Sequence, residues 1–247
     1  MPRRDPLKKS RRFRWLRRCA LAVIFLLLLP VAQVACVRFV NPPITPEMVR
    51  FKLFSSDAAA RKRGLRYAWM PLAQVPRQQI RYLWASEDQR FFKHGGIDFE
   101  EIDDALEESR KSGRKPRGGS TITQQCARSL FLWQGRSWLR KGLETYYTLV
   151  MERLLTKQRI LELYVNVIEF GDGIFGVKAA AETYYGVPPA RLSRAQMAML
   201  AAILPDPKEW SPIHPTPRVL QRQRRVLRLA AAADFPEAKL PPPATAR

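Results

Sequence analysis

Cysteine and histidine are scarce in this chain, which has three cysteines and two histidines among its 247 residues. Cys19 and Cys36 fall in a hydrophobic run near the N-terminus, so Cys126 is the one cysteine left in the remainder of the sequence. This number and spacing provide neither a disulfide framework nor a cysteine-based metal site. We therefore expect Cys126 to be a small buried apolar residue.

Acidic residues are also few, because 22 Asp and Glu stand against 43 Lys and Arg, which gives a formal net charge of +21. Such a field attracts nucleic acid, anionic lipid head groups or phosphorylated substrates, whereas a single basic cluster can simply be a solvated surface. The sequence shows neither an internal repeat nor a strong β-strand pattern. Its apolar content of 46% is sufficient for a folded core.

Residues 19–37 form a long apolar run that only Pro30 and Gln33 interrupt. As a helix this run would be about 28 Å long, close to the ~30 Å hydrocarbon core of a bilayer. Residues 1–18 carry nine Lys or Arg and one Asp, which predicts a retained single-pass anchor with a cytoplasmic N-terminus. A cleavable signal peptide is the alternative, but residues 32–35 make a poor cleavage site. An exported domain does not meet nucleic acid, so we exclude that class of partner.

Composition divides the chain into five segments, and caps, glycines and prolines delimit the expected helices. The segments are a basic cytoplasmic tail at 1–18, the transmembrane anchor at 19–37, a juxtamembrane connector at 38–66, a helical domain at 67–235 and a disordered Pro/Ala-rich tail at 236–247. The expected helices are 99–110, 121–132, 137–155, 156–166, 176–185, 193–204 and 216–233. The fold class is therefore mainly α.

An acidic pair, Glu87 and Asp88, precedes a turn that is rich in aromatic residues and glycine. Adjacent side chains point in different directions, so one carboxylate can face a cleft while the other orients it or caps a helix. Apolar packing in such a turn suits a general base. His94 in the same turn can orient a neighbour or bind metal, although a lone histidine is more often a packed structural residue.

Two glycines, Gly118 and Gly119, come directly before Ser120 and Thr121 at the start of an expected helix. Free N–H groups and the helix dipole at such a start favour a phosphate, and the glycines allow it to approach closely. Thr121 and Gln124 also have capping-box spacing, so an ordinary capped helix is the alternative. The Gly-Lys-Ser/Thr of a Walker A loop does not follow.

Arg140 and Lys141 precede Glu144 by four and three residues, which places both cations on its face of a helix. A carboxylate between two cations stays ionised, and it can position basic groups or recruit a metal ion. Arg128 and Arg136 concentrate more positive charge just upstream. A salt-bridged surface is the alternative interpretation.

Five ordered motifs contain these residues. They are Glu87-Asp88-x-x-Phe91-x-x-His94-x-Gly96, Gly118-Gly119-Ser120-Thr121-Ile122-Thr123-Gln124-Gln125, Arg140-Lys141-x-x-Glu144, residues 157–166, and Arg222-x-x-x-Val226-Leu227. Together they resemble the peptidoglycan glycosyltransferases (glycosyltransferase family 51), especially the monofunctional biosynthetic transglycosylases, over about residues 67–229. Arg128-Ser129 departs from the family's usual Lys-Asn, which keeps the charge but changes the contact geometry.

The resemblance implies a lysozyme-like domain that polymerises lipid II, a disaccharide-peptide on undecaprenyl pyrophosphate, into β-1,4-linked glycan strands. Glu87 would deprotonate the acceptor 4-hydroxyl, Glu144 would be the second catalytic glutamate, and Asp88 and His94 would support them. The expected substrate and pyrophosphate ligands are Gly119, Ser120, Thr121, Gln124, Gln125, Arg128, Arg136, Arg140 and Lys141.

The same resemblance implies no obligatory cofactor, with Glu144 as the expected ligand if Mg²⁺ or another divalent ion takes part. The expected partners are lipid II, the growing glycan strand and complexes for cell-wall synthesis or division. The expected location is the bacterial inner membrane, with the catalytic domain on its outer, periplasmic face.

Two other functions fit part of the sequence. A lysozyme-type hydrolase would share the fold and a glutamate, but it needs an acid for a sugar leaving group, whereas the abundant cations suit a phosphate. A non-catalytic anchored protein that binds anionic envelope polymers would explain the charge but not the paired glutamates. Ser112 and Lys115 match a Ser-x-x-Lys transpeptidase pattern, but no Lys-Thr-Gly follows, so we expect a monofunctional enzyme.

Overall fold

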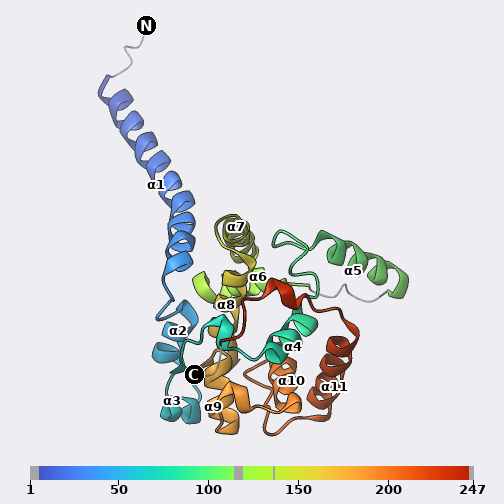
Figure 1. Ribbon diagram of the computed structural model, residues 1–247. Coiled ribbons are helices and arrows are strands. Elements are labelled where there is room, and N and C mark those ends of the chain that lie inside the picture. Colours follow the sequence, from blue (N-terminus) through green and yellow to red (C-terminus); the bar gives the residue numbers. More distant parts are fainter. Residues whose placement is uncertain (1–5, 114–118, 136, 245–247) are drawn as a thin grey trace.

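A long N-terminal helix projects from a helical domain in the computed structural model, which describes residues 6–113, 119–135 and 137–244 (Figure 1). This helix, α1 (Pro6–Phe39), contains an apolar stretch at Arg14–Phe39 with a mean hydropathy of 2.7. Its length and composition suffice to cross a membrane, which is consistent with a membrane-anchored protein.

The C-terminal half of α1 packs on α7 (Trp138–Leu154) rather than standing free of the domain. Tyr147 donates a hydrogen bond to Gln33, which explains the polar interruption of the apolar run. Tyr146 donates to the Leu27 carbonyl at 2.6 Å, and Arg159 donates to the Val37 carbonyl at 2.8 Å at the end of α1. The anchor and the domain are therefore joined by side-chain contacts as well as by the chain.

The segment that we expected as a connector contains two helices, α2 (Pro46–Phe54) and α3 (Ala58–Arg63). Met48 and Phe51 of α2 are buried, because their spacing of three places both on one helix face. The Phe51 ring lies against Gly173, where a Cβ atom would come within 2.4 Å of it. This segment is thus part of the folded domain.

Seven expected helices are present, and their N-terminal caps are Asp98, Thr121, Ser137, Thr156, Gly176, Ser193 and Thr216. They are α5 (Phe99–Ser112), α6 (Ile122–Phe131), α7, α8 (Lys157–Val167), α9 (Val177–Tyr185), α10 (Arg194–Ile203) and α11 (Pro217–Ala232). The helix α4 (Arg77–Glu87), which ends at the acidic pair, was not expected from the sequence.

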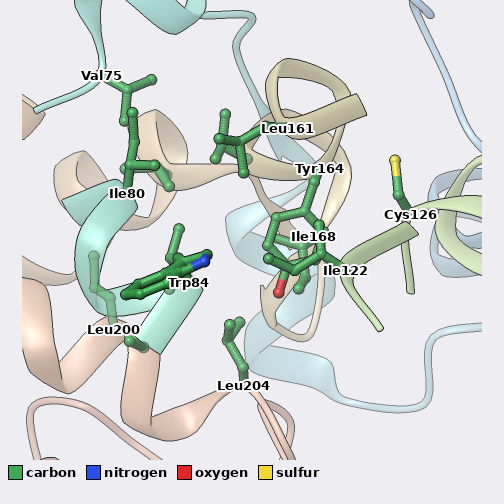
Figure 2. Packing of buried hydrophobic residues seen from close by; sticks show 14 of the residues in the cluster. Val75, Ile80, Trp84, Ile122, Cys126, Leu161, Tyr164, Ile168, Leu200 and Leu204 are labelled. Carbon is green, nitrogen blue, oxygen red and sulfur yellow. The ribbon is translucent and has the colours of Figure 1, made fainter. Parts of the chain in front are cut away.

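The core lies where α4 and α11 pack on α10, and where α7 and α8 pack on α6. Figure 2 shows Trp84 of α4 beside Leu200 of α10, with Tyr164 of α8 near Ile122 of α6. Cys126 is fully buried, and burial raises the pKa of its thiol, which confirms the expectation of an inert apolar residue.

A small sheet in the order β1-β3-β2 is present, although the sequence shows no strong β-strand pattern. Its strands are β1 (Arg66–Tyr67), β2 (Glu169–Gly171) and β3 (Ile174–Phe175). Strands of two or three residues are too short to show an alternating pattern, so they could not be predicted from the sequence.

The C-terminal segment is ordered up to residue 244, contrary to the expectation of a disordered tail. Leu240 is buried in the core, and Arg77 donates to the Pro241 carbonyl at 2.8 Å. The Ala244 amide donates to the Ala73 carbonyl at 2.9 Å. Leu240, the Arg77 side chain and a backbone hydrogen bond hold this segment, and none of these contacts gives a periodic sequence signal.

A buried charged cluster ties α2 to β2. Lys208 lies 2.9 Å from Glu47 and 3.3 Å from Glu169, and both carboxylates are buried. Burial raises the pKa of Glu169 to about 7, since desolvation and the neighbouring charges of Glu47 and Asp172 outweigh the attraction of Lys208. The folded protein therefore holds a proton on Glu169 at a pH where an unfolded chain would release it.

We expect Glu169→Gln to flatten the pH dependence of stability between pH 5 and 8. Because the pKa of Glu169 is raised from 4.5 to about 7 in the folded state, the wild-type free energy of unfolding falls as the pH rises through this window. The variant should be more stable at pH 8 by about 1–3 kcal/mol. Thermal unfolding in detergent at a series of pH values measures this, with the exposed Glu182→Gln as control. Parallel profiles for all three proteins would contradict the prediction.

Candidate active site

A cavity of about 430 Å³ opens where the end of α4 faces the start of α6 and one side of α11. Its lining includes two glutamates and three arginines, so it is strongly polar. The lining residues are Ser86, Glu87, Glu101, Gly119, Ser120, Gln125, Arg128, Leu204, Pro205, Arg222, Arg225, Val226 and Leu229. The cavity thus combines a carboxylate from the first motif with cations from separate helices.

Glu87, the last residue of α4, is held by hydrogen bonds to both carboxylate oxygens. Gln125 donates to its Oε2 at 2.9 Å, and Arg222 donates to its Oε1 at 3.2 Å. Tyr164 donates in turn to Gln125 Oε1 at 3.2 Å, which fixes the orientation of the amide. Burial raises the pKa of Tyr164 far above its usual value, so its hydroxyl remains a donor. Glu87 therefore has polar partners, where we had expected apolar packing.

Asp88 faces away from the cavity and joins α4 to α6. Its carboxylate accepts the Ile122 N–H at 3.0 Å in the first turn of α6 and the His94 Nε2–H at 3.0 Å. Because His94 Nδ1 accepts the Gly96 N–H at 3.0 Å, the imidazole proton belongs on Nε2. Asp88 and His94 thus shape the turn that follows Glu87, and their supporting role in catalysis stays a prediction.

These contacts also bear on metal binding. Asp88, His94 and Asp98 form a group whose ligand atoms lie within 4.8 Å of one another. However, Asp98 accepts the Glu101 N–H at the start of α5 and pairs with Arg90 at 3.4 Å. The contacts of this group therefore fit a hydrogen-bonded turn rather than a metal site.

Thr121 and Gln124 form a capping box at the start of α6. Thr121 Oγ1 accepts the Gln124 N–H at 3.2 Å, and Gln124 Oε1 accepts the Thr121 N–H at 3.1 Å. Both side chains are buried, and the Asp88 carboxylate already lies at the positive end of α6. Both side chains are thus engaged in capping α6, and pyrophosphate binding by these two residues stays a prediction. Gly119 and Ser120, by contrast, line the cavity.

Glu144 is fully buried and is surrounded by cations. Arg140 Nη1 and Lys141 Nζ each lie 2.6 Å from one of its oxygens, and Arg128 Nη1 lies 3.8 Å away. Glu144 does not line the cavity, so in this structure it positions Arg128 rather than touching a substrate. Arg136, the remaining cation expected here, lies outside the described residues.

The same contacts leave Glu144 unsuited to hold a divalent ion. Each oxygen already has a cation at hydrogen-bonding distance, and a metal ion beside Arg140 and Lys141 would be repelled. The expected metal role of Glu144 therefore does not fit the residues present.

Known proteins resemble this chain over most of its length. A family model described as Transglycosylase matches residues 56–231. The biosynthetic peptidoglycan transglycosylase of Caulobacter vibrioides is 46% identical over 215 residues, which cover 86% of this chain and 90% of that protein. The proteins of the same name from Pseudomonas aeruginosa and Xylella fastidiosa (strain M12) are 46% and 43% identical over 78% and 91% of this chain, and over 82% and 94% of their own lengths. The chain belongs to the transglycosylase family.

This transglycosylase has further site residues that the sequence-based set omitted. Arg222 and Tyr164 belong to the last two motifs, and the structure brings both to the Glu87 carboxylate, directly or through Gln125. Arg225 and Glu101 line the cavity without belonging to a recognised motif. Motif membership could have identified the first two, whereas only the tertiary structure could identify the others.

The transpeptidase pattern gains no support from the described residues. Ser112, the last residue of α5, donates a hydrogen bond to the Glu108 carbonyl at 2.7 Å. Lys115 lies outside the described residues. Among the residues that the structure describes, the cavity lining does not include Ser112.

We expect Glu144→Gln to destabilise the transglycosylase and to lower its activity. The neutral side chain leaves Arg140, which is buried, without its carboxylate, and losing one member of a buried pair costs about 3–5 kcal/mol. Thermal unfolding in detergent measures the loss. Glu107→Gln is the matched control, because Glu107 pairs with Lys111 on the surface and should contribute less than about 1 kcal/mol. Equal unfolding temperatures for the two variants would contradict this role.

Proposed function

We propose that the protein polymerises peptidoglycan glycan strands by transferring the disaccharide-peptide of lipid II to the 4-hydroxyl of an acceptor sugar. The observation that carries this proposal is the position of Glu87. Its carboxylate lines a cavity that also contains Arg128, Arg222 and Arg225, so a base and several cations face the same space. Because the chain belongs to the transglycosylase family, we infer that this arrangement serves glycosyl transfer.

Glu87 is the base in this reaction. It takes the proton of the acceptor 4-hydroxyl while that oxygen attacks the anomeric carbon of the donor, which forms the β-1,4 bond and inverts the configuration. Gln125 and Arg222 hold the carboxylate in one orientation, so no rearrangement is needed at the moment of proton transfer.

The leaving group is a lipid pyrophosphate, which departs as an anion and needs cations rather than a proton donor. Arg128 and Arg225 line the cavity and can bind it, and Glu144 keeps Arg128 in place from behind. Arg140 and Lys141 pair with the same Glu144 carboxylate, so they add positive charge behind Arg128. A divalent ion that assisted the reaction would have to be held by the pyrophosphate, because the cations around Glu144 disfavour a metal there.

A glycan hydrolase is the second candidate, because Glu101 places another carboxylate on the cavity. Hydrolysis of a glycosidic bond needs a pair of carboxyl groups, one of them protonated, to serve a sugar leaving group. The three arginines favour an anionic leaving group instead.

We expect Glu87→Gln to abolish polymer formation, with a loss of at least about 100-fold, because general-base catalysis contributes that much or more. Purified protein in detergent, incubated with labelled lipid II, measures the product on a gel. Glu101→Gln should retain polymerisation in a transferase, whereas a hydrolase would shorten pre-made glycan and lose that activity in both variants. Shortening of glycan without any polymer would overturn the proposal.

We place the protein in the bacterial inner membrane with its N-terminus in the cytoplasm and its domain on the outer face, where complexes for cell-wall synthesis or division can recruit it. The basic residues before the apolar stretch support this orientation, because positive flanks remain on the cytoplasmic side. The membrane also holds the lipid-linked substrate, so the anchor keeps the cavity near its supply.

An N-terminal epitope tag should therefore remain on the full-length protein and be protected from protease in spheroplasts. The domain should be digested under the same conditions. A mature protein that has lost the tag would indicate a cleaved signal peptide instead, and a protected domain would indicate the opposite orientation.

A further inference from the structure

Helix α11 carries five arginines and no acidic residue, and three of the arginines form a continuous stripe. Arg218, Arg222 and Arg225 are spaced four and three residues apart, so they lie on one face of the helix. Arg222 is bonded to Glu87, and Arg225 lines the cavity. Arg218 continues the stripe about one helical turn beyond the cavity. It is not among the residues that line the cavity.

The stripe is poorly neutralised within the part of the chain that the structure describes. Arg222 has a carboxylate partner, Glu87, whereas Arg218 and Arg225 have no ion-pair partner there. Like charges three and four residues apart destabilise a helix, so this arrangement is unfavourable unless an anion offsets it. The charge thus points to an anionic ligand that extends past the cavity.

Arg218 is exposed but held in place. Its guanidinium lies 5.5 Å from the centroid of the Trp210 ring, which is half-buried against the core. A cation above an indole keeps its charge and its hydrogen-bond donors while losing freedom of movement. Trp210 and the cavity-lining Leu204 and Pro205 belong to the same segment between α10 and α11, so this pair is continuous with the site.

The position of α11 favours a polymer over a lipid surface. Figure 1 shows α1 projecting from one end of the domain, with α10 and α11 toward the opposite end. A stripe that starts in the cavity and runs along α11 therefore leads away from the anchor. Anionic head groups at the membrane lie on the other side of the molecule.

We propose that Arg218, held by Trp210, forms an outer subsite that binds a peptide-stem carboxylate of the glycan strand beyond the reacting sugars. This rests on the proposed function, because the stems of peptidoglycan strands are what supply carboxylates at regular intervals. Arg225 and Arg222 serve the reacting unit, and Arg218 binds the next part of the strand. This contact would keep the strand bound to the protein between successive additions of disaccharide units.

Arg218→Ala tests this against Arg224→Ala, which removes the same charge from the same helix on a different face. One measurement is the length of strands made from labelled lipid II. The other is the affinity for uncross-linked glycan oligomers with intact stems, compared with oligomers whose stems an amidase has removed. Arg218→Lys keeps the charge but loses the planar fork of donors.

We expect Arg218→Ala to shorten the strands and to weaken binding of stem-bearing oligomers about tenfold, with Arg218→Lys between it and the wild type. Stem-free oligomers should bind the wild type and Arg218→Ala equally weakly. Arg224→Ala should resemble the wild type in both measurements. Equal affinities of the wild type, Arg218→Ala and Arg224→Ala for stem-bearing oligomers would overturn the subsite. So would a loss of binding to phosphatidylglycerol vesicles in Arg218→Ala with no change for the oligomers.

The oligomer binding assay needs no turnover, so it separates this inference from the proposed function. A wild-type protein that makes no polymer but binds stem-bearing oligomers through Arg218 would refute the transferase and retain the subsite. If the wild type makes polymer and every variant makes strands of the same length, the transferase is retained and the subsite is refuted.

Discussion

The hydrogen bond from the Ile122 amide to the Asp88 carboxylate is the contact on which the site depends. It joins the end of α4 to the first turn of α6, and His94 orients the same carboxylate from the following turn. Because Glu87 immediately precedes Asp88, fixing Asp88 against α6 also fixes where the Glu87 side chain can reach. Gln125, one turn into α6, then meets Glu87 at 2.9 Å. The start of α6 therefore also fixes the position of the Glu87 carboxylate.

Charge is distributed in two layers around this scaffold. Arg222 and Arg225 of α11 and Arg128 of α6 face the cavity, whereas Glu144 lies behind Arg128 with no exposed surface. The buried Glu144 carboxylate has two cations at 2.6 Å, and its attraction for Arg128, 3.8 Å away, keeps that guanidinium from turning away. Glu144 thus holds Arg128 from behind without lining the cavity, whereas Glu87, which does line it, pairs with Arg222. These pairs keep two of the three cavity arginines in defined positions in a chain with a large excess of positive charge.

The anchor takes part in the fold beyond tethering the domain. Gln33 and Leu27 of α1 accept hydrogen bonds from two tyrosines of α7, the helix that also carries Glu144. The depth of the domain relative to the apolar stretch is therefore set by side-chain contacts rather than by a flexible connector.

Caps, apolar periodicity and ordered motifs are local signals, and from them the sequence predicted seven helices, the long apolar helix, the family and Glu87 as the candidate base. Tertiary structure decided which residues of those motifs meet. Thr121 and Gln124 satisfy each other at a helix start, while Arg222, 135 residues after Glu87, reaches its carboxylate. It also decided that Glu144 is buried and that the short strands and residues 236–244 are ordered. Burial and long-range pairing depend on how helices pack, and no local pattern of residues encodes that arrangement.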